Sequence, residues 1–162
     1  MGAWIGSWLC ALDVMRQGIG KSPPATTSSH QERRMIRVKL MSILVNDQDR
    51  ARRFYSDVLG FRIKHDLPCG DAAWLTLVAP DDPEGVELLL EPAGHPAAAA
   101  LQQALYNDGI PLAQLYTGDI AAEFHRLTAK GVAFRGEPKA VGPTKFADFD
   151  DTCGNLIRLL QG

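Results

Sequence analysis

The sequence lacks the features that mark several large classes of protein. No apolar run approaches the roughly 20 residues that a membrane-spanning helix needs. No phosphate-binding loop of the form GxxxxGKS or GxxxxGKT occurs. Basic and acidic residues nearly balance, 17 against 19, and the pI is near 6.1, so no positive field would attract nucleic acid. We therefore expect no membrane partner and no nucleic-acid partner.

Cysteine is scarce as well. Cys10, Cys69 and Cys153 are odd in number and share no CxxC spacing, which argues against a disulfide framework and against a zinc site. We predict three reduced thiols in a cytoplasmic protein. Cys153 has no histidine near it in the sequence, and no Ser–His–Asp arrangement is visible, so nucleophilic catalysis is disfavoured.

Residues 1–34 differ in composition from the rest of the chain. Their first part, MGAWIGSWLCALDVM, is mildly apolar, but it lacks a basic start and is interrupted by Asp13, unlike a signal peptide. Their second part, GKSPPATTSSHQERR, is polar and rich in Pro, Ser and Thr, which is typical of a linker. We predict that residues 1–34 are a non-domain appendage and linker, and that residues 35–162 form a single domain.

The predicted domain contains an internal duplication. Residues 43–63, ILVNDQDRARRFYSDVLGFRI, have the pattern of a strand, an amphipathic helix with Asp47 as its N-cap, and a second strand. Residues 112–134, LAQLYTGDIAAEFHRLTAKGVAF, repeat this pattern with Asp119 as the N-cap. An internal repeat of this kind indicates two copies of one supersecondary unit.

Each half continues with two further predicted strands. These strands are expected at residues 72–79, 85–92, 144–150 and 155–161. Both halves therefore have the order βαβββ, with modules at about 35–93 and about 110–162. A helix at about 96–107, which starts with Pro96, is predicted to connect them.

The two βαβββ modules, with the segments VNDQDRARRFYSDVLGF, VELLLEP and FDDTCGNLIRLL, resemble the vicinal oxygen chelate superfamily. That group includes glyoxalases, bleomycin-resistance proteins and extradiol dioxygenases, and the resemblance covers essentially all of residues 35–162. It implies an α+β fold in which the two modules form a curled mixed sheet around a cavity. Several unrelated chemistries occur on this fold, so the resemblance alone does not define an activity.

The resemblance also indicates where a metal would be bound. Members of the superfamily usually hold a divalent metal with His, Gln or Glu from the first strand and usually Glu from the last strand of each module. The matching positions are Leu40, Glu87, Leu112 and Arg158. Leucine offers no ligand atom and arginine is a permanent cation, so only Glu87 is suitable. We predict no metal and no other cofactor; a site built from shifted ligands, such as His65, is the alternative.

A ligand site at the same place is the preferred interpretation. Strand alternation turns Glu87 and Arg158 toward the cavity, where we expect them to form an ion pair, because either charge buried alone would be costly. The predicted ligand-binding residues are Glu87, Arg158, Leu40, Leu112, Gln114 and Trp74. The alternatives are that both charges are solvated on an open sheet face and that Trp74 is a packed core residue.

Two functions follow from the resemblance. The first is a small-molecule-binding homodimer, similar to bleomycin-resistance proteins, with a degenerate and metal-free site. The second is a metal-dependent lyase (of the lactoylglutathione-lyase type), isomerase or dioxygenase acting on a small oxygenated substrate. In a metal-free enzyme Glu87 would be the candidate catalytic base, but a carboxylate beside an arginine is a weak base, which favours binding. The sequence leaves open whether the modules close within one chain or pair across a dimer.

Overall fold

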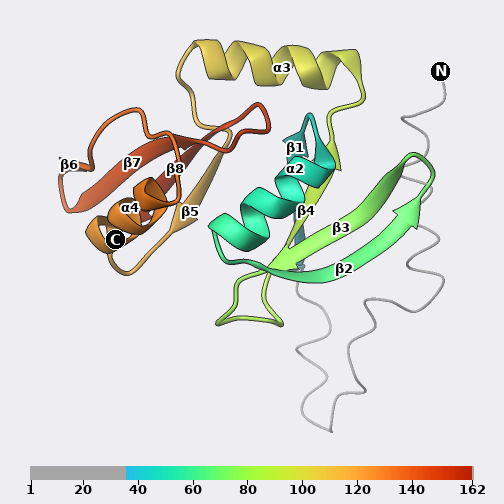
Figure 1. Cartoon of the computed structure of the whole chain (residues 1–162), viewed down its shortest axis with the longest axis horizontal. Helices are drawn as coiled ribbons and strands as arrows, with labels where there is room; N and C mark the ends of the chain where they lie inside the picture. Colours follow the sequence, from blue (N-terminus) through green and yellow to red (C-terminus); the bar gives the residue numbers. More distant parts are fainter. Residues whose placement is uncertain (1–35, 162) are drawn as a thin grey trace, which may run out of the picture.

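The computed structural model describes residues 36–161 and contains two separate four-stranded mixed sheets (Figure 1). The first sheet has the strand order β1-β4-β3-β2 and the second β5-β8-β7-β6. In both sheets the first and last strands of the module pair in parallel, and the other neighbours pair antiparallel. The predicted α+β fold of two βαβββ modules is therefore confirmed, and the two sheets do not close on each other within the chain.

The first module contains four strands and one helix. Its elements are β1 (Leu40–Val45), α2 (Gln48–Arg53), β2 (Arg62–Cys69), β3 (Ala72–Val78) and β4 (Glu87–Pro92). Asp47 caps α2, because its side chain accepts a hydrogen bond from the Arg50 amide at 2.9 Å. The helix continues as a π-helical turn, η2 (Phe54–Val58), which places Phe54 and Tyr55 side by side in the core.

The second module repeats this arrangement. Its elements are β5 (Ala113–Tyr116), α4 (Ile120–Ala129), β6 (Lys139–Val141), β7 (Thr144–Asp150) and β8 (Leu156–Gln161). Asp119 caps α4 by accepting hydrogen bonds from the amides of Ala121 and Ala122, each at 3.0 Å. The helix α3 (Pro96–Asn107) connects the two modules.

One hydrophobic core joins the helix-side faces of both sheets. It contains Ile43, Leu75, Leu77 and Leu90 from the first sheet and Ala147, Phe149, Ile157 and Leu159 from the second. The ring of Phe149 lies 6.2 Å from that of Phe54 and 5.5 Å from that of Phe134, measured between centroids. Because both sheets turn their helix-side faces toward this shared core, their other faces point away from each other.

Hydrogen bonds at the turn between β7 and β8 also connect the second module to α3 and β1. Gln102 of α3 donates hydrogen bonds to the Leu44 carbonyl at 2.9 Å and to Asn155 Oδ1 at 2.8 Å. Gly154 lies between them with φ +98°, and a Cβ there would approach Asn46 Nδ2 and Gln102 Nε2 to 3.2 Å. The positive φ therefore favours glycine, and any larger residue would also require the Asn46 and Gln102 side chains to shift by a few tenths of an ångström.

A buried carboxylate stands at the centre of this turn. Asp151 is fully buried and accepts hydrogen bonds from the Tyr55 hydroxyl, the amides of Cys153 and Asn155, and Asn155 Nδ2. Burial raises the pKa of Asp151 despite these hydrogen bonds. Burial, and then the neighbouring Asp151, raise the pKa of Tyr55 well above 10.0.

Replacing Tyr55 by Phe should change the response of stability to alkaline pH. Because the pKa of Tyr55 is higher in the folded chain, its contribution is complete below the unfolded value of 10.0 and declines as the pH rises above it. We expect Tyr55→Phe to cost about 1 kcal/mol at pH 7, and this gap to narrow by about 1 kcal/mol by pH 11. Urea unfolding at pH 7, 9 and 11 measures it. Wild type is the reference, and a Tyr55→Phe stability profile that runs parallel to that of wild type from pH 7 to pH 11 would contradict the assignment.

Three predictions about the chain as a whole have different outcomes. In the part that the structure describes, no helix combines the length and apolar character needed to cross a membrane. Cys153 is a buried free thiol, but Cys69 is disulfide-bonded, so the prediction of reduced thiols is wrong for Cys69. An odd number of cysteines means that not all of them can be paired, but it does not exclude one disulfide bond. The predicted appendage, residues 1–34, lies outside the described residues.

Candidate functional site

The side of the first sheet that points away from the core carries a second apolar cluster. We call this side the first outer face. Trp74 and Leu89 form its centre, 9% and 5% exposed, and Leu40, Leu67 and Cys69 pack against them. Leu88 and Leu90 belong to the main core, so alternation along β4 places Glu87, Leu89 and Glu91 on this outer face. The face thus combines an apolar centre with two carboxylates.

Glu87 forms an ion pair with Lys64 of β2 and lies close to His65 of the same strand. Lys64 Nζ lies 3.2 Å from Glu87 Oε1, and His65 Nε2 lies 3.9 Å from Glu87 Oε2. A register shift between Ile63 and His65 is a β-bulge, and it explains how two consecutive side chains reach the same carboxylate. The charge of Glu87 is therefore balanced within its own sheet.

Arg158 lies on the corresponding side of the second sheet, which we call the second outer face. Its Nε and Nη2 donate hydrogen bonds to the two carboxylate oxygens of Asp148 at 2.7 and 2.8 Å. The guanidinium also stacks over the Phe146 ring, 4.4 Å from its centroid. The hydrogen bonds from Arg158 to Asp148 raise the pKa of Arg158, so the group stays charged. Gln114 is the register partner of Arg158 on β5.

The structure divides the six predicted ligand-binding residues between different surfaces. Leu40, Trp74 and Glu87 lie on the first outer face, and Gln114 and Arg158 lie on the second. Leu112 precedes β5 and packs against the main core.

The predicted ion pair between Glu87 and Arg158 does not form among residues 36–161. Arg158 binds Asp148 and Glu87 binds Lys64 instead. The prediction failed because the shared core turns the two outer faces away from each other. The sequence favoured a turn for Asp148, which the structure places in β7, and it did not identify Asp148 or Lys64 as the ion-pair partners. Counting back across the turn between the last two strands would have found Asp148, which is the register partner of Arg158.

The residue types on the two faces do not fit a divalent metal. Of positions 40, 87, 112 and 158, only Glu87 carries a ligand atom, and the Lys64 ammonium already occupies its neighbourhood. The cationic guanidinium of Arg158 would repel a metal ion. Within residues 36–161, no three His, Cys, Asp or Glu side chains are grouped as metal ligands.

The fold and the two faces define a class of protein. The chain has two βαβββ modules, each with a mixed four-stranded sheet, and the outer faces combine apolar and charged side chains. The chain belongs to the Glyoxalase/Bleomycin resistance protein/Dioxygenase superfamily, whose family model matches residues 37–159. The resemblance found in the sequence is thereby confirmed.

Several known proteins are similar along nearly their whole length. YurT of Bacillus subtilis (strain 168) is 48% identical over 126 residues, which cover 78% of this chain and 99% of YurT. The crystal structure of UcmS2 superposes with a TM-score of 0.69 at 32% identity, covering 79% of this chain and 99% of UcmS2. TnmS3, an antibiotic binding protein from Streptomyces sp. CB03234, has a TM-score of 0.62 at 30% identity, covering 79% and 97% of the two chains.

Proposed function

We propose that this protein is a metal-free, small-molecule-binding member of the superfamily that works as a homodimer. The observation that carries the proposal is Arg158, bound to Asp148 at 2.7 and 2.8 Å and stacked on Phe146. Arg158 stands at one of the positions where the superfamily usually has a metal-binding carboxylate. A salt-bridged, stacked guanidinium provides a flat polar wall for an organic ligand, whereas it cannot bind a cation.

The homodimer follows from the orientation of the two outer faces. A ligand cavity needs more than one wall, and each outer face supplies only one. The shared core prevents the two faces of one chain from meeting. A twofold axis that brings the first outer face of one chain onto the second outer face of its partner creates two equivalent cavities. Tyr116, 73% exposed on β5, is one of the side chains that such a partner would cover.

The proposed class of ligand is based on what a similar protein binds. TnmS3 is an antibiotic binding protein, and it shares the fold of this chain at 30% identity. An apolar centre of Trp74 and Leu89 bordered by charged pairs suits a drug-like organic molecule of mixed polarity. We propose that a molecule of this class is the natural ligand.

A metal-dependent lyase, isomerase or dioxygenase is the second candidate. The observation in its favour is His65, whose Nε2 lies 3.9 Å from Glu87 Oε2, since imidazole and carboxylate both bind metals. The ammonium of Lys64, 3.2 Å from the same carboxylate, opposes a second cation there. Binding without a metal is therefore the better supported function.

Metal analysis and probe binding on the same purified protein test the proposal. We expect less than about 0.1 equivalent of any transition metal per chain, and saturable binding of the neutral dye Nile red at about one dye per chain. Trp74→Ala should weaken dye binding about tenfold or more, because it removes the side chain at the centre of the apolar cluster that forms this wall. Turnover of the methylglyoxal–glutathione hemithioacetal should stay absent after Ni²⁺, Zn²⁺ or Fe²⁺ is added. Stoichiometric metal or metal-dependent turnover would establish the enzyme instead.

A further inference from the structure

Arg158 on the second outer face has hydrogen-bond donors that no other described residue uses. A guanidinium carries five N–H donors. Asp148 accepts one from Nε and one from Nη2, at 2.7 and 2.8 Å, and no other group of residues 36–161 accepts from this side chain. Both N–H groups of Nη1 and one of Nη2 therefore remain. One N–H from each of these nitrogens points outward at the end of the guanidinium, and the two form a second, free fork.

The free fork is accessible and fixed in its orientation. The Arg158 side chain is 31% exposed. In the part of the chain that the structure describes, Thr76 Oγ1 is the single buried polar side-chain atom without a hydrogen-bond partner, so the unpartnered Nη1 of Arg158 is open to solvent. The two hydrogen bonds to Asp148 and the stacking on Phe146, 4.4 Å from the ring centroid, hold the plane and the rotation of the guanidinium. The fork is therefore oriented in the absence of a ligand.

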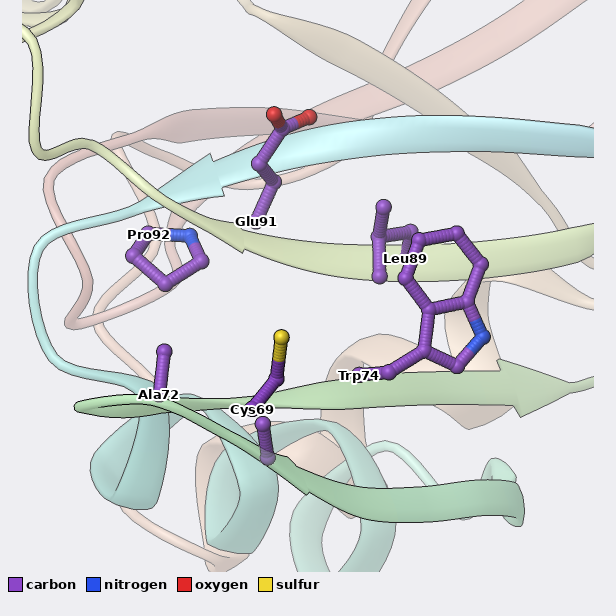
Figure 2. Close-up of a pocket in the computed structure, with 7 residues that line it drawn as sticks. Cys69, Ala72, Trp74, Leu89, Glu91 and Pro92 are labelled. Carbon is purple, nitrogen blue, oxygen red and sulfur yellow. The ribbon is translucent and has the colours of Figure 1, made fainter. Parts of the chain in front are cut away.

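The acidic hollow on the first outer face does not offer a comparable site. Figure 2 shows the Glu91 carboxylate pointing away from the indole of Trp74, with Leu89 between them. The hollow that these residues border has a volume of about 10 Å³, which is room for about one water molecule. The charged group best placed to contact a ligand is therefore the guanidinium of Arg158 on the second outer face.

We propose that the free fork of Arg158 is a subsite for a carboxylate, so that the ligand of this protein is an organic acid. This inference rests on the proposed small-molecule-binding function and specifies its ligand class. A carboxylate has two oxygens that match the two N–H groups of the fork. Asp148 binds the other side of the guanidinium, so a ligand carboxylate lies closer to the cation than to Asp148, and attraction exceeds repulsion. The exposed side chain of Gln114, the register partner of Arg158, is a further donor beside the fork.

The same geometry disfavours other ligand groups. An ammonium ion has no acceptor for the free N–H groups, and the guanidinium would repel it. A neutral amide has a single oxygen to offer. Its hydrogen bonds to the fork are also weaker, because hydrogen bonds between ionised partners are roughly twice as strong as neutral ones. Arg158 therefore selects a carboxylate over both groups.

Three probes that share a benzyl group and differ in charge test the subsite. They are phenylacetate, phenylacetamide and 2-phenylethylamine, titrated at pH 7 against the full-length protein by calorimetry and by displacement of Nile red. We expect phenylacetate to bind about tenfold or more tightly than phenylacetamide, which has the same shape without the charge, and the amine to bind most weakly. In Arg158→Gln the ratio of phenylacetate to phenylacetamide affinity, measured by calorimetry, should fall to about one.

Two further variants separate the fork from positive charge in general. Arg158→Lys keeps the charge but has no planar pair of N–H groups, so the preference for phenylacetate should fall to about threefold. Arg53→Gln, at an exposed arginine of α2, is the matched control, because it removes the same charge from the helix side of the first module. It should keep the full preference. Circular dichroism shows which variants are folded, and the wild-type comparison of the three probes decides by itself if the Arg158 variants do not fold.

The proposal is wrong if wild type binds phenylacetate and phenylacetamide equally, or if either Arg158 variant keeps the full preference. A preference that Arg53→Gln also abolishes would show an effect of overall charge and would overturn the subsite. Nile red binding in wild type without a preference for phenylacetate overturns the subsite and leaves the proposed function standing. Absence of Nile red binding counts against the proposed function, and calorimetry with phenylacetate then decides separately whether the fork binds carboxylates.

Discussion

Mixing a Trp74→Ala chain with an Arg158→Gln chain should restore part of the Nile red binding that each variant lacks alone. In a cavity shared between two chains, every cavity of either homodimer has one altered wall. A mixed dimer has one cavity with both walls intact and one with both altered. Random assortment after joint refolding of equal amounts makes about half of the dimers mixed, so about a quarter of all cavities should regain wild-type affinity. Each homodimer alone should bind about tenfold or more weakly.

A mixture of two variants of the same outer face is the control. Trp74→Ala and Leu89→Ala both alter the first outer face, so no cavity in their mixed dimers has two intact walls, and binding should not recover. Sedimentation equilibrium on each sample confirms that dimers are present. A monomeric wild type, or no recovery in the Trp74/Arg158 mixture, would show that the cavity is not shared between chains.

The two modules could be predicted because their signals are local. The caps Asp47 and Asp119 precede helical stripes of the same spacing, and both caps make the expected hydrogen bonds. Strand alternation also placed the residues of β4 and β8 correctly, with Leu88, Leu90, Ile157 and Leu159 facing the core. A period of two residues fixes the face of every side chain once one of them is known.

The arrangement of the modules was not predictable from the same signals. Whether the two outer faces converge depends on Phe54, Phe134 and Phe149, which come from both modules and meet in one core. Each of these residues has a helix or strand pattern that would equally suit a core confined to its own module. The partners of Glu87 could not be predicted from strand alternation either. The bulge at Ile63–His65 shifts the register of β2, so alternation does not place its side chains correctly.

The charged pairs connect this arrangement to function. Glu87 and Arg158, which were expected to pair with each other, instead form ion pairs within their own sheets. Glu87 pairs with Lys64, and Arg158 pairs with Asp148. The charges of Glu87 and Arg158 are therefore compensated within a single chain. In the proposed homodimer neither residue would need the partner chain to balance its charge.

Replacing Asp151 by Asn should destabilise the fold strongly. One carboxylate oxygen accepts hydrogen bonds from the amides of Cys153 and Asn155 at 2.8 and 2.9 Å. The other accepts from the Tyr55 hydroxyl and Asn155 Nδ2 at 3.0 and 2.6 Å. An asparagine amide has one oxygen, so either orientation turns its NH2 group against two donors. We expect a loss of about 3 kcal/mol in the free energy of unfolding, measured in urea at pH 7.

The coupling between Asp151 and Tyr55 distinguishes this mechanism from a general disturbance of the core. In the Asp151→Asn background the hydrogen bond from Tyr55 is already lost or weakened. Tyr55→Phe should therefore cost about 1 kcal/mol less there than in wild type, and the double-mutant cycle gives that difference directly. Asp71→Asn, at an exposed aspartate, should change stability by less than about 0.5 kcal/mol. An Asp151→Asn variant as stable as Asp71→Asn would show that the buried carboxylate does not hold the second module to the first.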